Sequence, residues 1–139
     1  MKLRPFHLAF PVYDLKETIQ WYTNILSCSI GRQSKHWVDF NFYGHQITAH
    51  KIDFKTSKDQ TNSVDGYNIP SRHFGIILKM NQWEMLCKHL KENKIKFIIE
   101  PNIRFEDEKG EQATLFIKDP SNNILEFKAF NNDSMIFEH

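Results

Sequence analysis

Three residues of this chain have side chains suited to metal chemistry: His7, His73 and Glu126. Each falls in a separate predicted strand. Two imidazoles with one carboxylate form a donor set that can hold a divalent ion and leave part of its coordination shell open. His7 and His73 are 66 positions apart (73 − 7), and each opens a strand–helix unit. The spacing therefore suggests two copies of one module that build a single metal site.

The elements that must position these residues follow the same order twice along the chain. In the first copy, a strand over 3–12 precedes a capping-box pattern at Asp14–Glu17 and an amphipathic helix. The remaining predicted elements of this copy are a short strand over 29–32, an alternating strand over 37–42, a turn at Tyr43-Gly44 and a returning strand over 45–53. The order is strand–helix–strand–strand–strand.

The second copy repeats this order. A strand over 73–79 leads to a capping-box pattern at Asn81–Glu84, which lies 67 positions after the first one (81 − 14). The predicted elements that follow are a strand over 95–100 ended by Pro101, a charged loop over 102–111, and strands over 112–118 and 124–130 joined by a turn-rich segment. We therefore predict an α+β fold in which two βαβββ modules form a curved mixed-sheet cleft or barrel, with the helices on its convex side.

The chain is long enough for one domain with its own hydrophobic core. We predict a single domain over 1–139, divided into module one (1–53), a linker (54–71), module two (72–130) and a tail (131–139). The linker is polar, and its Asp65-Gly66 and Ile69-Pro70 pairs are typical breakers of regular structure. We therefore expect it to be a long, mobile connection near the mouth of the pocket.

Strand alternation assigns a set of polar side chains to the concave face. The apolar faces of the strands over 37–42 and 124–130 should pack on the helices, so the opposite faces line the concavity. Unpaired polar groups are costly in a core, which favours a lined pocket. Besides the three metal-binding candidates and His50, the predicted pocket residues are Trp37, Asp39, Asn41, Gln46, Thr48, Gln112, Thr114 and Phe116.

The charge of the chain is nearly balanced, with 18 basic and 17 acidic residues, and the basic residues are scattered. This composition argues against nucleic acid or an anionic membrane surface as a partner. No apolar run is long enough for a transmembrane helix, and the N-terminal residues lack the apolar segment of a signal peptide. Cys28 and Cys87 are too few and too far apart for a disulfide framework, which favours a reduced, cytoplasmic protein.

Several stretches of the sequence resemble the vicinal oxygen chelate superfamily, which includes glyoxalase I, bleomycin-resistance proteins and extradiol dioxygenases. Three of them are Phe6–Phe10 leading into Asp14-Leu15, His73–Ile76 and Asp119–Phe127. The resemblance covers essentially the whole chain. Two further stretches, Asp39–Gln46 and Gly110–Phe116, are similar to a small single-domain branch of predicted extradiol-type dioxygenases.

The resemblance implies roles for particular residues. The metal ligands of the superfamily fall on His7, His73 and Glu126 of this chain. Glyoxalase I adds a fourth, carboxylate ligand on the last strand of module one, where this chain offers His50. Extradiol enzymes instead keep an uncoordinated catalytic histidine there, a role that fits His50, with His45 as a second candidate. Acid/base catalyst, fourth ligand and structural residue stay open for His50.

The resemblance also implies a metal-dependent enzyme that acts on a small molecule with a vicinal oxygen pair. We favour an extradiol-type, catechol-cleaving dioxygenase with Fe(II), although Mn(II), Zn(II) and Ni(II) accept the same ligands. The alternatives are a glyoxalase-type lyase or isomerase and a metal-free resistance protein that binds an aromatic drug. We expect a homodimer, and the sequence leaves open whether the site forms within one chain or is shared between chains.

Overall fold

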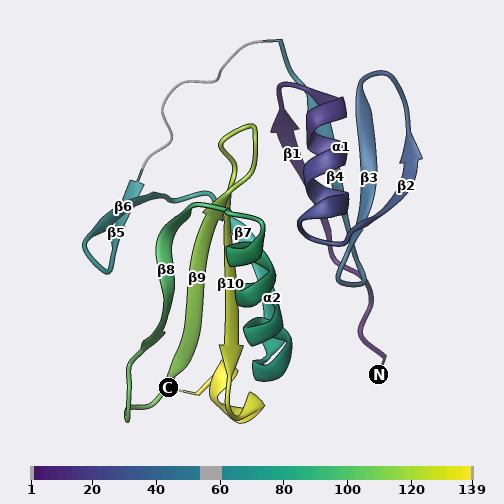
Figure 1. Ribbon diagram of the computed structural model, residues 1–139. Coiled ribbons are helices and arrows are strands. Elements are labelled where there is room, and N and C mark those ends of the chain that lie inside the picture. Colours follow the sequence, from purple (N-terminus) through teal and green to yellow (C-terminus); the bar gives the residue numbers. More distant parts are fainter. Residues whose placement is uncertain (1, 54–60, 139) are drawn as a thin grey trace. The chain divides into compact units, whose positions relative to one another are not determined.

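The computed structural model describes residues 2–53 and 61–138 (Figure 1). By their internal contacts the residues divide into two compact units. The first contains Met1–Lys58 together with Asp119–Asn123, and the second contains Asp59–Lys118 together with Ile124–His139. Each unit has its own sheet and its own helix, and each is therefore described by itself.

The first unit is built on a four-stranded sheet with one helix. Its elements are β1 (His7–Val12), α1 (Leu15–Asn24), β2 (Ser29–Gln33), β3 (Trp37–Phe42) and β4 (His45–Lys51). The strand order is β1-β4-β3-β2, with β1 parallel to β4 and the other neighbours antiparallel. The Asp14 side chain accepts a hydrogen bond from Glu17 N over 2.8 Å, which confirms the predicted helix cap.

The helix of the first unit packs on its sheet through Tyr22. The Tyr22 ring is fully buried and stacks on Phe40 of β3, with the ring centres 5.1 Å apart. Its hydroxyl donates to Asp119 Oδ2 over 3.0 Å. Asp119 Oδ1 also accepts from Ser121 N and Asn123 N, which closes a compact turn that belongs to the first unit. Burial raises the pKa of Asp119, because desolvation outweighs these hydrogen bonds.

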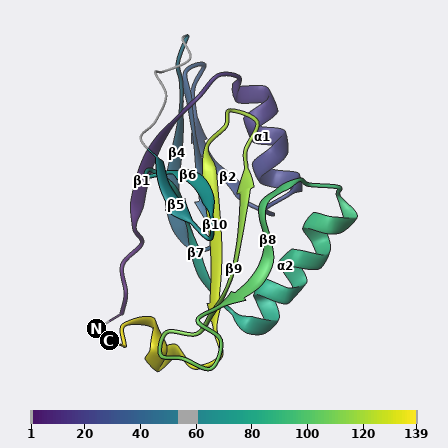
Figure 2. The same ribbon diagram turned by 90° about the vertical axis from the view of Figure 1, so that its left-hand side faces the viewer.

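The second unit repeats the same arrangement. Its main elements are β7 (Phe74–Lys79), α2 (Met80–Glu92), β8 (Phe97–Arg104), β9 (Gln112–Lys118), β10 (Ile124–Phe130) and a short 3-10 helix over Asp133–Ile136. The strand order β7-β10-β9-β8 matches that of the first sheet, and β7 is parallel to β10. Figure 2 shows α2 lying along one face of this sheet, where Trp83 Nε1 donates to the Phe127 carbonyl over 3.0 Å.

The two units confirm the predicted α+β fold with two βαβββ modules. Each helix contacts its own sheet. In the described residues, neither four-stranded sheet closes into a barrel. No helix in this part of the chain is long and apolar enough to cross a membrane.

Part of the predicted linker is a β-hairpin, although the sequence predicts a long loop there. β5 (Thr61–Val64) pairs with β6 (Tyr67–Pro70), and Asp65 and Gly66 form the turn with φ values of 47° and 82°. An Asp-Gly pair favours such a left-handed turn, so these residues connect two strands and do not interrupt them. Residues 54–60 of the predicted linker lie outside the described residues.

The hairpin packs into the second unit through the buried side chain of Ile69. Ile69 is 1% exposed and belongs to a buried cluster with Ile99, Phe116 and Ile124. Burial of a complete isoleucine side chain stabilises a fold by about 1.5–3 kcal/mol. The hairpin is therefore a packed element at this residue.

The predicted start of the second helix is wrong by two residues, since the cap is Lys79 and not Asn81. The expected cap is Asn81, but α2 begins at Met80. Gln82 Oε1 accepts a hydrogen bond from Lys79 N over 3.2 Å, which satisfies the backbone at the residue before the helix. Because Gln82 reaches back in this way, Lys79 occupies the cap position.

The predicted end of the strand at Pro101 is also wrong. β8 continues through Pro101 to Arg104. The pairing of β8 with β9 is irregular between Ile99 and Asn102, which accommodates a residue that lacks a backbone N–H. β8 is an edge strand of its sheet, and edge strands tolerate proline.

Candidate metal centre

Glu126 is a buried carboxylate in the middle of β10. It is 8% exposed and lies between Leu125 and Phe127, which are fully buried. Thr114 Oγ1 donates to Glu126 Oε1 over 2.9 Å, and Lys128 Nζ lies 3.6 Å from the same oxygen. These contacts hold Oε1 in place and leave Oε2 for another partner.

His73 faces the second oxygen of this carboxylate. It immediately precedes β7, and its Nε2 lies 3.3 Å from Glu126 Oε2. Its Nδ1 lies 3.0 Å from the Pro70 carbonyl oxygen. Because a carbonyl oxygen only accepts, Nδ1 must carry a proton and donate it, which assigns the tautomer. The ring also contacts Phe116, with the ring centres 5.5 Å apart.

The facing atoms of His73 and Glu126 have an electrostatic consequence. In the neutral tautomer that donates to Pro70, the Nε2 lone pair of His73 is directed at an oxygen of the ionised carboxylate. Two facing lone pairs repel, so the pair requires a proton or a metal cation between the two atoms. A protonated imidazole would form an ion pair here, and the same two atoms are also donors that suit a divalent cation.

Close strand packing fixes the backbone of Glu126. Gly75 on β7 pairs directly with Glu126 on β10. A Cβ atom at position 75 would overlap the carbonyl oxygen of Glu126, so only glycine lets the two strands approach to this extent.

His7 opens β1 in the first unit and is oriented in a similar way. Its Nδ1 lies 2.9 Å from Gln46 Oε1, and the two residues pair across β1 and β4. An amide oxygen only accepts, so Nδ1 again carries the proton and Nε2 keeps its lone pair. Imidazoles that bind metals commonly anchor one nitrogen in this manner and present the other.

Asp39 orients the amide group of Gln46. Gln46 Nε2 donates to Asp39 Oδ2 over 3.5 Å, and Thr48 Oγ1 donates to Asp39 Oδ1 over 2.6 Å. Arg32 Nε lies 3.7 Å from Oδ2 of the same carboxylate, which is itself buried. A chain of hydrogen bonds thus runs from Asp39 through Gln46 to His7 and selects the nitrogen that His7 presents.

The strand registers place the predicted pocket residues on two faces, one in each unit. Residues that pair directly across strands share a face. In the first sheet this face carries His7, Trp37, Asp39, Asn41, Gln46, Thr48 and His50. In the second sheet it carries Gln112, Thr114, Phe116, Glu126 and Lys128.

Of the three predicted ligands, the structure brings His73 and Glu126 together, and His7 lies in the other unit. Within residues 2–53 and 61–138, no group of three or more His, Cys, Asp or Glu side chains is arranged to hold a metal ion. The three-ligand site therefore stays a prediction.

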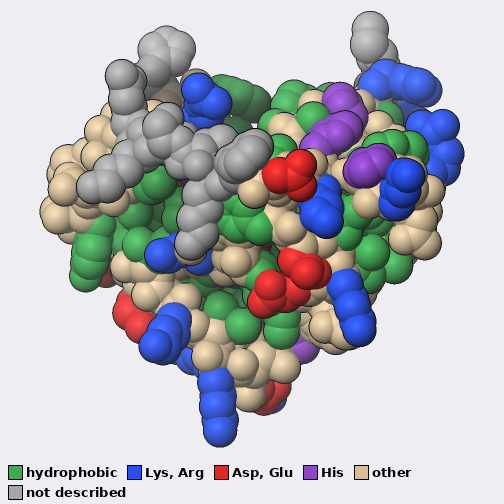
Figure 3. Space-filling view, turned by 90° about the horizontal axis from the view of Figure 1, so that it is seen from above, with side chains coloured by type: hydrophobic (Ala, Val, Ile, Leu, Met, Phe, Trp, Pro, Cys, Tyr) green, Lys and Arg blue, Asp and Glu red, His purple; other side chains and the backbone are tan. Residues whose placement is uncertain are grey.

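His50 lies on the same face as His7 but at the other end of β4. β1 and β4 pair His7 with Gln46, and His50 is four residues further on (50 − 46), or about 13 Å along the strand. Two side chains that stand perpendicular to a sheet do not converge on one ion over this distance. His50 is exposed. Histidine side chains in general lie beside Lys and Arg side chains on the face drawn in Figure 3. This register argues against His50 as a fourth ligand.

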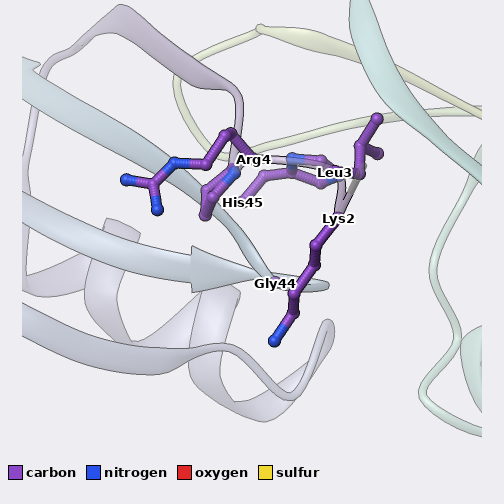
Figure 4. Close-up of a pocket in the computed structure, with 6 residues that line it drawn as sticks. Lys2, Leu3, Arg4, Gly44 and His45 are labelled. Carbon is purple, nitrogen blue, oxygen red and sulfur yellow. The ribbon is translucent and has the colours of Figure 1, made fainter.

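The first unit also has an open cavity that none of the predicted ligands lines. Its volume is about 460 Å³, and its lining residues are Lys2, Leu3, Arg4, Pro5, Gly44 and His45 (Figure 4). His45 Nδ1 accepts a hydrogen bond from Phe6 N over 2.9 Å, which ties the start of the chain to the turn before β4. His45, the second catalytic candidate, therefore has a structural partner.

Two contacts of the centre are absent from the predicted site. The Pro70 carbonyl lies in the hairpin, and the Asp65-Gly66 pair is the sequence signal that could have located it. Lys128 is absent from the predicted pocket, although strand alternation puts it on the face of Glu126.

A model of the Glyoxalase/Bleomycin resistance protein/Dioxygenase superfamily matches residues 4–127. The chain belongs to this superfamily. A similar solved structure is the glyoxalase/bleomycin resistance protein/dioxygenase from Alicyclobacillus acidocaldarius, which is 34% identical over 96% of each chain with a TM-score of 0.77. These findings confirm the predicted vicinal oxygen chelate superfamily.

Two other solved structures of this superfamily's fold are similar at lower identity. The genomically encoded fosfomycin resistance protein FosX from Listeria monocytogenes is 15% identical over 97% of this chain and 98% of its own, with a TM-score of 0.69. A virulence protein from Salmonella typhimurium is 18% identical over 94% of this chain and 98% of its own, with a TM-score of 0.62. At these identities the likeness shows the fold alone. No curated protein matches the chain.

Proposed function

We propose that the chain is a metal-dependent enzyme that cleaves a catechol-like substrate by extradiol-type dioxygenation. Membership of a superfamily of metal-dependent enzymes and resistance proteins supports the broader part of this proposal. The observation that carries it is the His73–Glu126 pair, in which Nε2 lies 3.3 Å from Oε2. The other atom of each group already has a partner, because His73 Nδ1 contacts the Pro70 carbonyl and Glu126 Oε1 accepts from Thr114. A cation shared by the two atoms would be held by a nitrogen lone pair and a carboxylate oxygen, which are both common metal donors.

The residues that would hold the metal are His7, His73 and Glu126. The imidazoles would use Nε2 and Glu126 would use Oε2, because Nδ1 of each ring and Oε1 of the carboxylate already have partners. We propose Fe(II), and Mn(II), Zn(II) and Ni(II) accept the same donors. When bound, such a metal acidifies the hydroxyls of a chelating substrate, and iron adds redox chemistry toward dioxygen.

Two features of the first sheet support a dioxygenase over a glyoxalase-type enzyme. The inward residues of β4 are Gln46, Thr48 and His50, so this strand supplies no carboxylate for a fourth ligand. The carboxylate on the neighbouring strand, Asp39, is engaged by Thr48 and Arg32. Three protein ligands leave room for two substrate oxygens and dioxygen on one ion.

The protein residues would orient the substrate and move its protons. We propose His50 as the acid/base residue, because it shares the inward face of β4 with Gln46 and Thr48. Trp37 is proposed to contact an aromatic ring, since it lies on the inward face of the first sheet and is partly exposed. Phe116, the other aromatic residue of the predicted pocket, is 1% exposed and packs in the buried cluster with Ile69.

We also propose that residues 1–139 act as one domain, with modules over 1–53 and 72–130, and that two copies form a dimer. The third ligand, His7, then comes either from the same chain or from the partner copy. Mixing a His7→Ala chain with a Glu126→Ala chain distinguishes the two cases, because metal binding returns only if the site is shared, and then in one of the two sites of each mixed dimer.

The function is tested by metal analysis and turnover on one preparation. The chain is loaded anaerobically with Fe(II). Oxygen uptake is then measured with a panel of catechols, and isomerisation is measured separately with 2-oxoaldehyde adducts. Oxygen uptake with a catechol and a ring-opened product supports the proposal. Isomerase activity without oxygen uptake favours the glyoxalase alternative. Tight binding of an aromatic compound by metal-free protein, with neither activity, favours the binding-protein alternative.

A further inference from the structure

Lys128 places a positive charge directly beside the proposed metal ligand Glu126. It lies two residues further along β10, pairs with Thr114 of β9 and therefore shares the inward face. Its Nζ lies 3.6 Å from Glu126 Oε1, and its side chain is 33% exposed. The ammonium group is thus accessible on the face that would receive a substrate.

The charge of Lys128 exceeds what the carboxylate requires once a metal is present. Glu126 Oε1 already accepts a hydrogen bond from Thr114, and a dication on the Oε2 side would neutralise the carboxylate. An ammonium group next to a dication is electrostatically unfavourable at short range. A site that only holds metal does not require the charge of this lysine, because Thr114 already orients Oε1.

The same face carries other basic residues further from Glu126. Lys118 pairs with Ile124, two residues before Glu126, whereas Lys79 and Arg104 lie about four residues along the strands. Arg104 has an acidic partner of its own, since its Nε lies 3.2 Å from Asp65 Oδ1. Two neutral imidazoles and one carboxylate leave a bound dication with one net positive charge, and Lys128 raises that charge to two. A substrate that carries an additional negative charge would balance it.

We propose that Lys128 determines specificity for a substrate that bears a carboxylate close to its two chelating oxygens. The inference rests on the proposed function, since it concerns the substrate of the same site. The Lys128 ammonium group would donate a charge-assisted hydrogen bond to the substrate carboxylate. Such bonds favour the charged ligand roughly tenfold to a hundredfold over a neutral one.

The test compares acids with neutral analogues of the same shape. Catechol carboxylic acids with the carboxyl group at position 3 or 4 are titrated calorimetrically into anaerobic, Fe(II)-loaded protein, next to the corresponding carboxamides. We expect one of the acids to bind roughly tenfold to a hundredfold more tightly than its amide. In Lys128→Met this ratio should fall to near one, and in Lys128→Arg it should be largely kept.

Two controls make the outcome decisive. Lys88→Met removes a lysine from α2, where Lys88 pairs with Glu92, and should leave the acid-to-amide ratio unchanged. Iron content is measured for every variant, and Lys128→Met should bind at least as much iron as the wild type. Equal binding of acid and amide by the iron-loaded wild type, or an unchanged ratio in Lys128→Met, overturns the inference alone. Absence of iron binding, or of any catechol binding, overturns the proposed function and this inference together.

Discussion

His73 Nε2 and Glu126 Oε2 face each other across 3.3 Å, and the other polar atom of each side chain has a separate partner. The Pro70 carbonyl accepts from His73 Nδ1, and Thr114 donates to Glu126 Oε1. Both reactive atoms are therefore oriented before any metal arrives. Such prior orientation lowers the entropy that a ligand set loses on binding.

We expect alanine at His7, His73 or Glu126 to remove most of the bound metal while the fold is kept. Each substitution deletes one of three donors, and an octahedral ion held by two loses much of its affinity. Metal content after anaerobic Fe(II) loading and desalting measures the effect. Glu100→Ala, an exposed position on β8, is the matched control and should retain metal. Full occupancy in Glu126→Ala contradicts the ligand assignment.

We expect Gln46→Leu to change the tautomer of His7 and weaken metal binding by roughly tenfold to a hundredfold. The leucine keeps a similar volume but removes the amide oxygen that accepts from Nδ1 over 2.9 Å. Nitrogen-15 NMR of the imidazoles in metal-free protein reports the tautomer directly. Gln20→Leu, at an exposed position of α1, should leave the His7 signals unchanged. An unaltered tautomer in Gln46→Leu would show that other contacts orient the ring.

Most of the fold could be predicted from the sequence because its signals are local and repeated. The strands over 112–118 and 124–130 have the predicted bounds, since apolar residues recur at alternate positions between clear turns. Asp14 caps the first helix as its spacing to Glu17 indicates. The errors at Asn81 and Pro101 arise from a side chain that reaches back by three residues and from an edge strand that tolerates proline.

The candidate site could be predicted only in part, because alternation assigns a face but not a neighbour. His50 and His7 share a face, yet only the register shows that four residues of β4 separate their positions. The contact between His73 and the Pro70 carbonyl depends on the hairpin. The polar composition of this segment indicates a loop, so the sequence did not predict the hairpin. Composition is a weak guide to structure where a turn signal such as Asp65-Gly66 is present.

We expect Ile69→Ala to destabilise the second unit by about 2–5 kcal/mol and to loosen the orientation of His73. Ile69 is 1% exposed in the cluster with Phe116, and Pro70 follows it directly. Urea unfolding measures the first effect, and the nitrogen-15 signals of His73 measure the second. Tyr67→Ala in the same hairpin is the control, because Tyr67 is 52% exposed and should lose little stability. Equal stability of the two variants would contradict a packed hairpin.

Amide exchange provides an independent test of the same hairpin. If β5 and β6 form the observed ladder, the amides that pair between Asn62 and Ile69 should exchange more slowly than those of an exposed loop. Uniformly fast exchange over residues 61–70 would instead support the mobile connection that the sequence predicts.

The buried Asp119 should make stability depend on pH in a defined direction. Burial raises its pKa above the usual 3.8, so the folded protein binds this proton more tightly than the unfolded chain. Its contribution to the free energy of unfolding is therefore largest below about pH 4 and falls as pH rises through the raised pKa. The difference between wild type and Asp119→Asn, from urea unfolding between about pH 3 and about pH 7, should decrease accordingly. A difference that grows with pH would contradict the direction of the shift.

His50→Ala should keep the metal and slow turnover by roughly 10²–10⁴-fold, the range expected when a general acid/base is lost. Metal retention follows from the register, since about 13 Å of β4 separates His50 from the partner of His7. Iron analysis and oxygen uptake on one preparation measure both quantities, and His36→Ala, at an exposed neighbouring position, is the control. Loss of iron in His50→Ala would restore the fourth-ligand interpretation. Unchanged iron and unchanged turnover would leave His50 a structural role, because a residue that neither binds the ion nor moves a proton has no part in the reaction.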